Sequence, residues 1–483
     1  MCTLKTQWIY GCLALRFSAV QTAEQWFPVS LFERVRPFAE RIDSGLNGHG
    51  DAAKAQRASL IAFAIRILSA IIAFLSQVIL ARLMGPFEYG IFVLVWVAMV
   101  IIGGLSCLGF QTAIIRFLPE YTEQNDLPRI RGMLVSSRIF VLLFSSLVAL
   151  TTVGVVYIGA DWFENYLVLP FIVGAIALPM IALGDMLDGT ARAQGWPIRA
   201  LGPTYILRPL FILVMMVVVW ALGYSINGVS ALLCAVAATY FSSLIQFFVM
   251  NKNLNTAFAD GGRTVEMGYW LRVAFPIFLV EGFFFLLVNA DILMVGLLMT
   301  PEDVAIYYAT VKTIAVVHFV FFAVKAGVAN LFAARINDVD QSALRNLARR
   351  SASWSFWPSL FVGAAVLVAG PLLLALFGEA FTDGYPLMFI MVAGVVLRAS
   401  IGPAESLLNM SGNQNICAVV IGCVLVVNIV FNFALIPIYG LYGAAIATAI
   451  ATLLETLSLY YLVRSRIGVS MFALAPVPRE DEG

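Results

Sequence analysis

The stretch IFVLVWVAMVIIGGL, residues 91–105, contains no charged side chain and lies inside an apolar run that extends from about residue 87 to residue 111. A helix of about 20 apolar residues crosses the hydrocarbon core of a bilayer, which is about 30 Å thick. A strand of a membrane barrel would alternate apolar and polar residues over about ten positions, and this run does not. The stretch therefore predicts a transmembrane helix.

The rest of the chain repeats this pattern with short interruptions. Apolar runs long enough for a spanning helix lie near residues 58–83, 87–111, 133–159, 167–190, 203–222, 228–250, 270–299, 303–332, 353–377, 385–411, 416–436 and 441–463. Open sheet edges and unpaired backbone groups do not occur in lipid, so runs of this length form helices. The predicted fold is an all-α integral membrane protein with about 12 transmembrane helices.

The composition excludes the main soluble classes. The chain has 483 residues, of which 61% are hydrophobic and 12% charged, and its mean hydropathy is +0.93. Soluble domains carry about 25% charged residues, so a soluble enzyme, a disordered protein and a secreted disulfide scaffold are excluded. The formal net charge is +1 and no long basic run occurs, which predicts no nucleic-acid partner. None of the six cysteines forms a CxxC pair, and we interpret them as packing residues.

Lysine and arginine gather in alternate connections between the predicted spans. The cation-bearing connections and the segments that flank the first and last spans contain Lys54, Arg57, Arg129, Arg131, Arg192, Arg199, Lys252, Arg263, Arg335, Arg345, Arg349, Arg350, Arg464, Arg466 and Arg479. The opposite connections lack Lys and Arg and contain Asp161, Glu164, Glu302, Glu379 and Asp383. Because cytoplasmic loops carry the excess of Lys and Arg, both termini are predicted to be cytoplasmic and the number of spans even.

A short repeat divides the chain into two halves. Leu83-Met84-Gly85-Pro86 and Leu298-Met299-Thr300-Pro301 occupy the same outer turn of their halves, at an offset of 298 − 83 = 215 residues. Six spans separate the copies, so the halves share one orientation, and parallel repeats of this kind are a transporter architecture with the substrate site between the halves. The predicted organisation is a cytoplasmic N-terminal extension at 1–56, an N-lobe of six spans at 57–251, a cytoplasmic linker at 252–269, a C-lobe of six spans at 270–465 and a cytoplasmic tail at 466–483.

The N-terminal extension contains no predicted span, because its apolar segment from Trp8 to Leu15 is short and ends at Arg16. We interpret residues 1–56 as a loosely ordered extension. The alternative is an interfacial amphipathic helix near residues 27–41.

Motifs for catalysis and cofactor binding are absent from the sequence. No Gly-Lys dipeptide occurs, which excludes a P-loop for ATP. The only histidines are His49 and His318, which argues against a histidine-built metal site. The predicted outer loops are too short for the catalytic site of a membrane glycosyltransferase. We therefore predict that the chain is not an enzyme and that it has no cofactor.

Arg66, Lys312 and Arg398 are the three cations that we place at the level of the membrane midplane in the predicted spans. A charge in a span costs roughly 2.5–3.5 kcal/mol on insertion scales, so such residues mark functional sites. We predict that Arg66, Lys312 and Arg398 line a water-filled cavity that accepts an anion. The alternative is internal ion pairing, for example between Arg398 and Glu405, which are seven residues apart and share a helical face.

The acidic side chains and one imidazole within the spans are Glu281, Asp291, Glu405 and His318. The carboxylates are candidates for binding a coupling ion, Na⁺ or H⁺, or for pairing internally with cations. His318 is a candidate proton relay, and the alternative is a packed, hydrogen-bonded imidazole.

Three segments resemble one family. Residues 81–92, ARLMGPFEYGIF, are similar to the first-loop signature of bacterial Wzx-type polysaccharide-export flippases. Residues 289–294 with 306–309, NADILM and IYYA, resemble the seventh-to-eighth span region of that family. Residues 432–447, NFALIPIYGLYGAAIA, resemble its eleventh-to-twelfth span turn. The resemblance covers roughly residues 58–465 and places the chain in the multidrug/oligosaccharidyl-lipid/polysaccharide (MOP) superfamily.

The resemblance implies a fold and a function. The fold is that of MATE and other MOP proteins, with two six-helix lobes around a cationic cavity that works by alternating access. The implied function is to move undecaprenyl-diphosphate-linked oligosaccharide, a repeat unit of O-antigen, capsule or exopolysaccharide, from the cytoplasmic to the periplasmic leaflet of the bacterial inner membrane. Implied partners are the lipid-linked oligosaccharide, membrane lipid and the polysaccharide polymerase and export machinery. Arg or Lys would neutralise the diphosphate.

Three other functions are open on the sequence. An ion-coupled multidrug or cation antiporter on the same fold would require an acidic cavity, and the mixture of charges here disfavours it. A membrane-embedded enzyme of glycan assembly is disfavoured by the short outer loops. A peptidoglycan-precursor flippase of the same superfamily usually has fourteen spans, which exceeds the predicted number.

Overall fold

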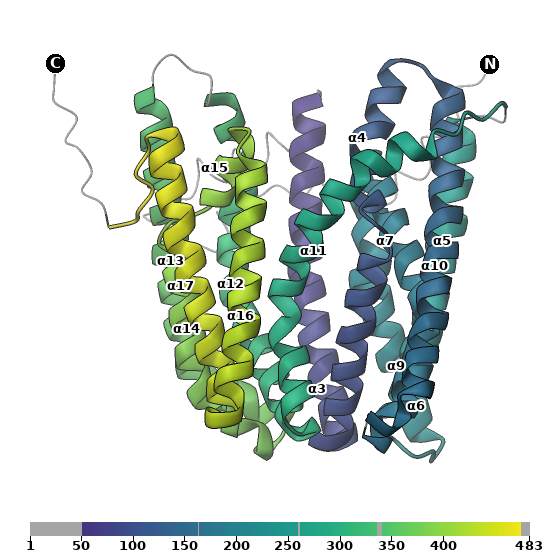
Figure 1. Ribbon diagram of the computed structural model, residues 1–483, viewed down its shortest axis with the longest axis vertical. Coiled ribbons are helices and arrows are strands. Elements are labelled where there is room, and N and C mark those ends of the chain that lie inside the picture. Colours follow the sequence, from purple (N-terminus) through teal and green to yellow (C-terminus); the bar gives the residue numbers. More distant parts are fainter. Residues whose placement is uncertain (1–50, 163, 259–260, 336–340, 475–483) are drawn as a thin grey trace, which may run out of the picture.

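The computed structural model describes residues 51–162, 164–258, 261–335 and 341–474, and these form helices and no strands. Figure 1 shows two upright groups of helices, one from each half of the chain. Residues 1–50 of the predicted extension, with the alternative interfacial helix, and residues 475–483 of the predicted tail lie outside the described residues.

The helices follow the apolar runs of the sequence. In the first half they are α3 (Asp51–Leu105), α4 (Phe110–Glu123), α5 (Leu127–Ile158), α6 (Asn165–Ala175), α7 (Leu178–Ala193), α8 (Pro197–Gly202), the π-helical turn η2 (Pro203–Leu207), α9 (Arg208–Ala221) and α10 (Gly228–Ala257). In the second half they are α11 (Met267–Leu298), α12 (Pro301–Arg335), α13 (Gln341–Phe377), the 3₁₀ turn η3 (Glu379–Gly384), α14 (Tyr385–Ala399), α15 (Ala404–Met410), α16 (Gln414–Tyr439) and α17 (Leu441–Ile467).

Helix α3 is two spans, because the chain reverses at Gly85. Gly85 has φ 75° and ψ 170°, outside the helical region. The Tyr89 hydroxyl donates a hydrogen bond to Gln77 Oε1 at 2.8 Å, whereas residues twelve apart in a straight helix are about 18 Å apart along its axis. We call residues 51–84 the first limb of α3 and residues 86–105 its second limb. The turn lies in the predicted repeat motif.

The number of spans agrees with the prediction. Ten helices of the described residues are long and apolar enough to cross a membrane, and α6 with α7, bent by 46°, forms an eleventh span. Counting the second limb of α3 separately gives twelve. Helix α3 begins and α17 ends at the same end of the bundle (Figure 1), as an even number of spans requires.

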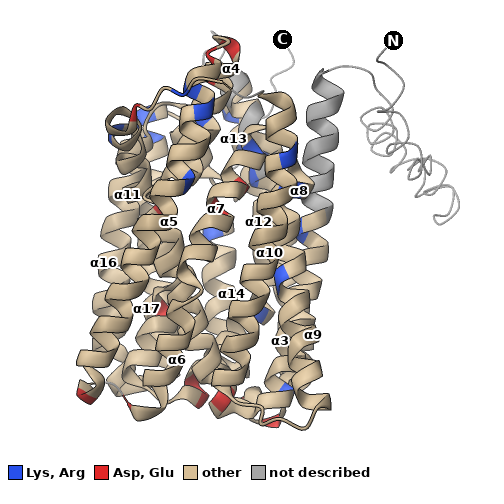
Figure 2. Ribbon diagram, turned by 90° about the vertical axis from the view of Figure 1, so that its right-hand side faces the viewer, with Lys and Arg blue, Asp and Glu red and all other residues tan. Residues whose placement is uncertain are grey.

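The two ends of the bundle differ in charge (Figure 2). One end, here called the acidic end, carries the turns with Asp161, Glu164, Glu302, Glu379 and Asp383. The opposite, cation-rich end carries Arg129, Arg131, Arg192, Arg199, Arg464 and Arg466. This separation follows the alternation of loops in the sequence.

The two halves share one core toward the acidic end. Toward the cation-rich end, the start of α11 packs in a core with helices of the first half, and other helices of the second half form a core of their own. The shared core includes Tyr89 and Phe92 of α3 with Tyr307 of α12 and Phe381 of η3. A second core, toward the cation-rich end, joins α4, α5 and α7 to the start of α11. A third joins α12, α13, α15 and α17. No core of described residues joins α4 and α5 to α13 and α15, although α11 of the second half packs on α4 and α5.

Polar and close backbone contacts also join the halves at the acidic end. Arg82 Nε donates to the carbonyl oxygen of Leu376, at the end of α13, at 2.7 Å. Arg82 Nη2 donates to the carbonyl of Ala375. The carbonyls at a helix C-terminus lack partners within the helix, so a cation is favourable there. Gly90 packs directly against the Pro301 backbone, where a Cβ atom would overlap the carbonyl group.

Replacing Gly90 by alanine is therefore expected to loosen the closed acidic end. Overpacking costs about 1–3 kcal/mol, which corresponds to roughly a 5- to 150-fold shift of an opening equilibrium. Hydrogen–deuterium exchange of the peptides around residues 86–95 and 301–310 should become faster. The control is Gly154→Ala, because a Cβ atom at Gly154 meets no atom within 4 Å. Unchanged exchange in Gly90→Ala would show that this contact does not hold the halves together.

Candidate functional site

Lys312 lies in an apolar groove between the two halves. It is eleven residues after the start of α12 at Pro301, about 16 Å along the helix and so near mid-depth. The groove has a volume of about 500 Å³ and is lined by Ile67, Ala70, Ile71, Phe74 and Leu75 of α3 and by Lys312, Ala315, Val316 and Phe319 of α12. Lys312 is the one polar side chain among these residues.

No carboxylate of the described residues neutralises Lys312. Its Nζ atom lies 4.7 Å from the centroid of the Tyr308 ring, a cation–π contact. Ion pairs within 4.0 Å join other residues of the described chain and leave Lys312 unpaired. An unpaired ammonium group in an apolar groove is a binding element for an anion.

Arg66 lies on the first limb of α3, next to the groove residue Ile67, and its side chain is exposed. It makes no ion pair within 4.0 Å in the described part of the chain. Arg66 does not line the groove, and it lies close enough to Tyr205 of η2 to act electrostatically on it.

Arg398 is paired. Its Nε atom donates to Glu455 Oε1 at 3.0 Å, and Nη1 donates to the carbonyl of Gly402 at 3.3 Å. Glu405 instead accepts from Lys325 at 3.0 Å. The suggested Arg398–Glu405 pairing is not formed, because α14 ends at Ala399 and Gly402, at φ 54°, redirects the chain before α15. Of the three predicted cavity cations, Arg398 is the one that forms an ion pair with another described residue, Glu455.

Asp291 is buried among neutral hydrogen-bond donors. Its side chain is 7% exposed. Oδ1 accepts from Asn428 Nδ2 at 2.9 Å and from Asn432 Nδ2 at 3.0 Å, both on α16, and Oδ2 accepts from Thr448 Oγ1 of α17 at 2.5 Å. No Lys or Arg of the described residues lies within 4.0 Å of this carboxylate. Asn432 Oδ1 is buried and has no hydrogen-bond partner.

These oxygens are suited to a hard monovalent cation or a proton. A buried carboxylate without a compensating charge is costly, and a bound cation or proton would remove that cost. Oxygen ligands of this type favour hard cations over transition metals. Across the described residues, no group of three or more His, Cys, Asp and Glu side chains is arranged to hold a metal ion.

Glu281 and His318 lie outside both the Lys312 groove and the hydrogen-bonded group around Asp291. Glu281 accepts from Thr112 Oγ1 at 2.7 Å and from Gln111 Nε2 at 3.3 Å, both on α4. Helix α11 therefore contacts α4 through Glu281 and α16 through Asp291, and Figure 1 shows it crossing from one group of helices to the other. His318 lies on α12 with its side chain exposed.

Two cations within the spans, Arg138 and Arg208, were not among the predicted site residues. Arg138 is buried on α5 and donates through Nη1 to Asn251 Oδ1 at 2.6 Å. Arg208 is the first residue of α9, directly after η2, and its guanidinium carbon lies 5.7 Å from the centroid of the Trp96 ring. The signal was present, since Arg208 interrupts the apolar run 203–222 and is bracketed by Pro203 and Pro209. Sequence reasoning also missed Asn428, Asn432 and Thr448 as partners of Asp291.

The comparisons with known proteins identify the family. The family model described as polysaccharide biosynthesis protein matches residues 56–329, more than half of the chain. The chain belongs to the polysaccharide biosynthesis protein family. A second family model, MatE, matches residues 276–434 of this family member. No protein with a curated description matches the chain.

Solved structures of MOP proteins share its fold. One, titled an inward-facing conformation of a multidrug resistance MATE family transporter of the MOP superfamily, has a TM-score of 0.68 at 15% identity and covers 83% of this chain and 94% of that one. The corresponding outward-facing structure has a TM-score of 0.60 at 14% identity, with 88% and 97% covered.

A third structure, a MOP superfamily transporter from Pyrococcus furiosus with a binding pocket described as of reverse polarity, has a TM-score of 0.59 at 15% identity and covers 88% of this chain and 97% of that one. The polysaccharide biosynthesis protein is thus a membrane transporter or flippase of the MOP superfamily and not an enzyme. Its MOP fold confirms the predicted fold class.

Proposed function

We propose that this polysaccharide biosynthesis protein flips undecaprenyl-diphosphate-linked oligosaccharide from the cytoplasmic to the periplasmic leaflet by alternating access. The observation that carries the proposal is the unpaired Lys312 in an otherwise apolar groove between the halves. A lipid-linked diphosphate has the matching chemistry, since its headgroup is anionic and its chain is apolar. The oligosaccharide would be a repeat unit of O-antigen, capsule or exopolysaccharide.

The arrangement of the halves supports entry from the cation-rich end. The halves share a core at the acidic end, whereas at the other end no core of described residues joins α4 and α5 to α13 and α15. By the positive-inside rule, the cation-rich end would face the cytoplasm and both termini would be cytoplasmic, in a bacterial inner membrane. The prenyl chain would remain in the bilayer while the diphosphate passes Arg66 and Lys312. The partners would be the lipid-linked oligosaccharide, membrane lipid and the polymerase and export machinery that use the product.

A multidrug or cation antiporter is the second candidate, because a MatE model matches residues 276–434. Such a carrier needs carboxylates that are free to bind a cationic substrate. Glu405 and Glu455 are neutralised by Lys325 and Arg398. Asp291 and Glu281 form no ion pair within 4.0 Å among the described residues, but neither lines the groove, where Lys312 would repel a cationic substrate. The charge arrangement therefore favours an anionic substrate.

We further propose that Asp291 binds the coupling cation, Na⁺ or H⁺. Its carboxylate lacks a charged partner among the described residues, and Asn432 Oδ1 beside it is free to become a further ligand. Helix α11 carries Asp291 and also contacts α4 through Glu281. Cation binding at Asp291 would thus act on a helix that connects the halves.

Asp291→Asn is expected to remove the dependence of transport on the ion gradient, because the neutral amide cannot balance the charge of a bound cation. In liposomes, a Na⁺ or H⁺ gradient that accelerates transport by the unmodified protein should leave the variant unaffected. The control is Asp161→Asn, which removes an exposed carboxylate at the acidic end. A variant that responds to the gradient as the unmodified protein does would exclude Asp291 as the coupling site.

Deletion of the gene in its native host tests the proposed function directly. Lipid-linked oligosaccharide should accumulate on the cytoplasmic side and the corresponding surface polysaccharide should disappear. Re-expression of the chain should restore the polysaccharide. Normal surface polysaccharide in the deletion strain, together with a new sensitivity to cationic drugs, would favour the antiporter.

A further inference from the structure

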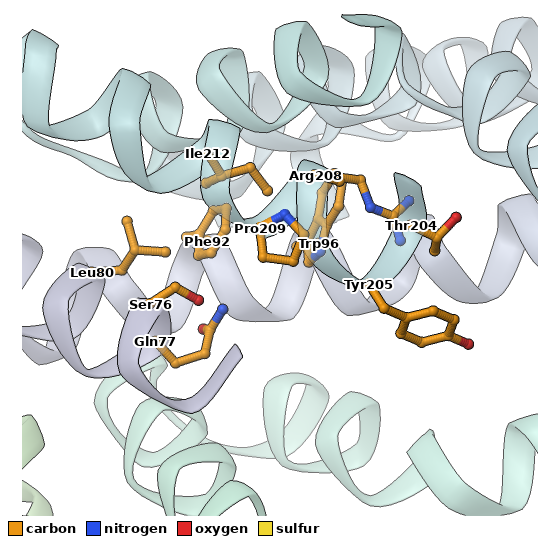
Figure 3. A pocket seen from close by; sticks show the side chains of 10 residues that line it. All are labelled: Ser76, Gln77, Leu80, Phe92, Trp96, Thr204, Tyr205, Arg208, Pro209 and Ile212. Carbon is orange, nitrogen blue, oxygen red and sulfur yellow. The ribbon is translucent and has the colours of Figure 1, made fainter. Parts of the chain in front are cut away.

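A second pocket lies within the first half of the chain, apart from the Lys312 groove (Figure 3). Its volume is about 170 Å³. The two limbs of α3, the π-helical turn η2 and the start of α9 surround it. The polar and aromatic side chains that line it include Ser76, Gln77, Trp96, Thr204, Tyr205 and Arg208.

The π-helical turn η2 positions this pocket. Single π-turns in α-helices are rare and are found frequently at functional sites. Here the turn spans Pro203–Leu207 and is followed directly by Arg208. Arg208 is eleven residues after the start of α8 at Pro197 and thirteen before the end of α9 at Ala221. It therefore lies at mid-depth, where a charge is costly and marks a functional site.

The polar groups of the pocket have unused hydrogen-bonding capacity. Gln77 accepts a hydrogen bond through Oε1 from Tyr89, which leaves its Nε2 group free. Thr204, Tyr205 and Arg208 make no side-chain hydrogen bond with any described residue. Tyr205 is 45% exposed, and its hydroxyl points away from the other lining side chains in Figure 3. The free donors of Gln77, Thr204 and Arg208 are therefore the groups of this pocket that are available to a ligand rich in hydrogen-bonding groups.

Charges of both signs surround this pocket. The carboxylates of Asp185 and Asp188 and the guanidinium groups of Arg208, Arg192 and Arg66 lie close enough to act electrostatically on one another or on Tyr205, although no ion pair within 4.0 Å joins them among the described residues. This mixture distinguishes the pocket from the groove around Lys312, whose other lining residues carry no charge.

We propose that this pocket binds one sugar ring of the transported glycan, an inference that rests on the proposed function. A cavity of about 150 Å³ holds one benzene ring, so 170 Å³ accommodates one six-membered ring. Sugar hydroxyls both donate and accept hydrogen bonds, which matches the free groups of Gln77, Thr204 and Arg208. The partly exposed Trp96 ring provides apolar contact for the C–H groups of the sugar.

Saturation-transfer NMR with the full chain in nanodiscs tests the pocket. The probes are the methyl glycosides of glucose, galactose, mannose, N-acetylglucosamine and N-acetylgalactosamine, with inorganic pyrophosphate as the anionic probe. At least one glycoside should bind. Trp96→Ala and Arg208→Gln should weaken that binding at least tenfold, and Gln77→Leu provides a third variant if either fails to fold. The matched controls are Trp220→Ala and Arg464→Gln, whose side chains are exposed elsewhere.

Three outcomes overturn the sugar pocket. These are no binding of any glycoside, glycoside binding that the pocket variants leave unchanged, and loss of pyrophosphate binding rather than glycoside binding in Arg208→Gln. A parallel leaflet-transfer assay with the unmodified protein separates this result from the proposed function. If the unmodified protein transfers lipid-linked glycan but no glycoside binds at the pocket, only the assignment of the sugar pocket is wrong. If the unmodified protein transfers no lipid-linked glycan, the proposed function is wrong.

Discussion

Lys312→Gln is expected to weaken the binding of undecaprenyl diphosphate by roughly 10- to 100-fold. A hydrogen bond to a charged group is worth about 1.5–3 kcal/mol, and each 1.4 kcal/mol is about tenfold in affinity. The effect should be this large because the groove around Lys312 is apolar and its other lining residues offer no hydrogen-bond donor to replace the ammonium group. Native mass spectrometry of the purified protein with undecaprenyl diphosphate measures the affinity.

Two variants control for loss of fold and for general loss of charge. Lys312→Arg retains the cation and should keep most of the affinity, whereas Lys252→Gln removes an exposed lysine near the end of α10 and should change nothing. Equal affinity of Lys312→Gln and the unmodified protein would show that the headgroup binds elsewhere.

Arg398→Leu is expected to destabilise the protein by about 3–5 kcal/mol, because it leaves Glu455 as an uncompensated, largely buried charge. The two side chains are 13% and 16% exposed. The double variant Arg398→Leu/Glu455→Leu should recover most of this loss, since replacing both members of a buried pair with apolar residues is often neutral. Thermal unfolding in detergent, compared among the three proteins, gives the result.

The same set of variants decides the role of Arg398. If the double variant is stable and still binds and transports the lipid-linked glycan, Arg398 serves the structure through its pair with Glu455. If the double variant is stable but inactive, Arg398 contributes to substrate handling. A single variant as stable as the unmodified protein would contradict the importance of the ion pair.

The fold could be predicted from the sequence because lipid imposes a simple requirement. Each span must be long, apolar and helical, so a run such as 87–111 can be recognised from the sequence as a transmembrane helix. The reversal at Gly85 was also predictable, because Gly-Pro interrupts two apolar runs. The close approach of Gly90 to Pro301 was not, since it joins residues more than 200 positions apart.

The candidate site was less predictable, because partners come from different helices. The seven-residue spacing of Arg398 and Glu405 suggested a pair, but the turn at Gly402 directs each to another helix. Asp291 was visible as a charge in a span, whereas its neutral partners Asn428 and Thr448 carry no such signal. Its proposed role as a cation site depends on the absence of a charged neighbour among the described residues, and a sequence alone cannot show that.

Transfer of lipid-linked glycan between leaflets tests the proposed flippase function directly. The purified protein is reconstituted into liposomes that contain fluorescent undecaprenyl-diphosphate oligosaccharide, and an impermeant quencher reports which leaflet holds it. A flippase should transfer a cognate glycan at a rate well above that of protein-free vesicles. Absence of transfer for several cognate glycans, with and without Na⁺ and H⁺ gradients, combined with efflux of a cationic dye, would contradict the flippase function and identify a cation exporter.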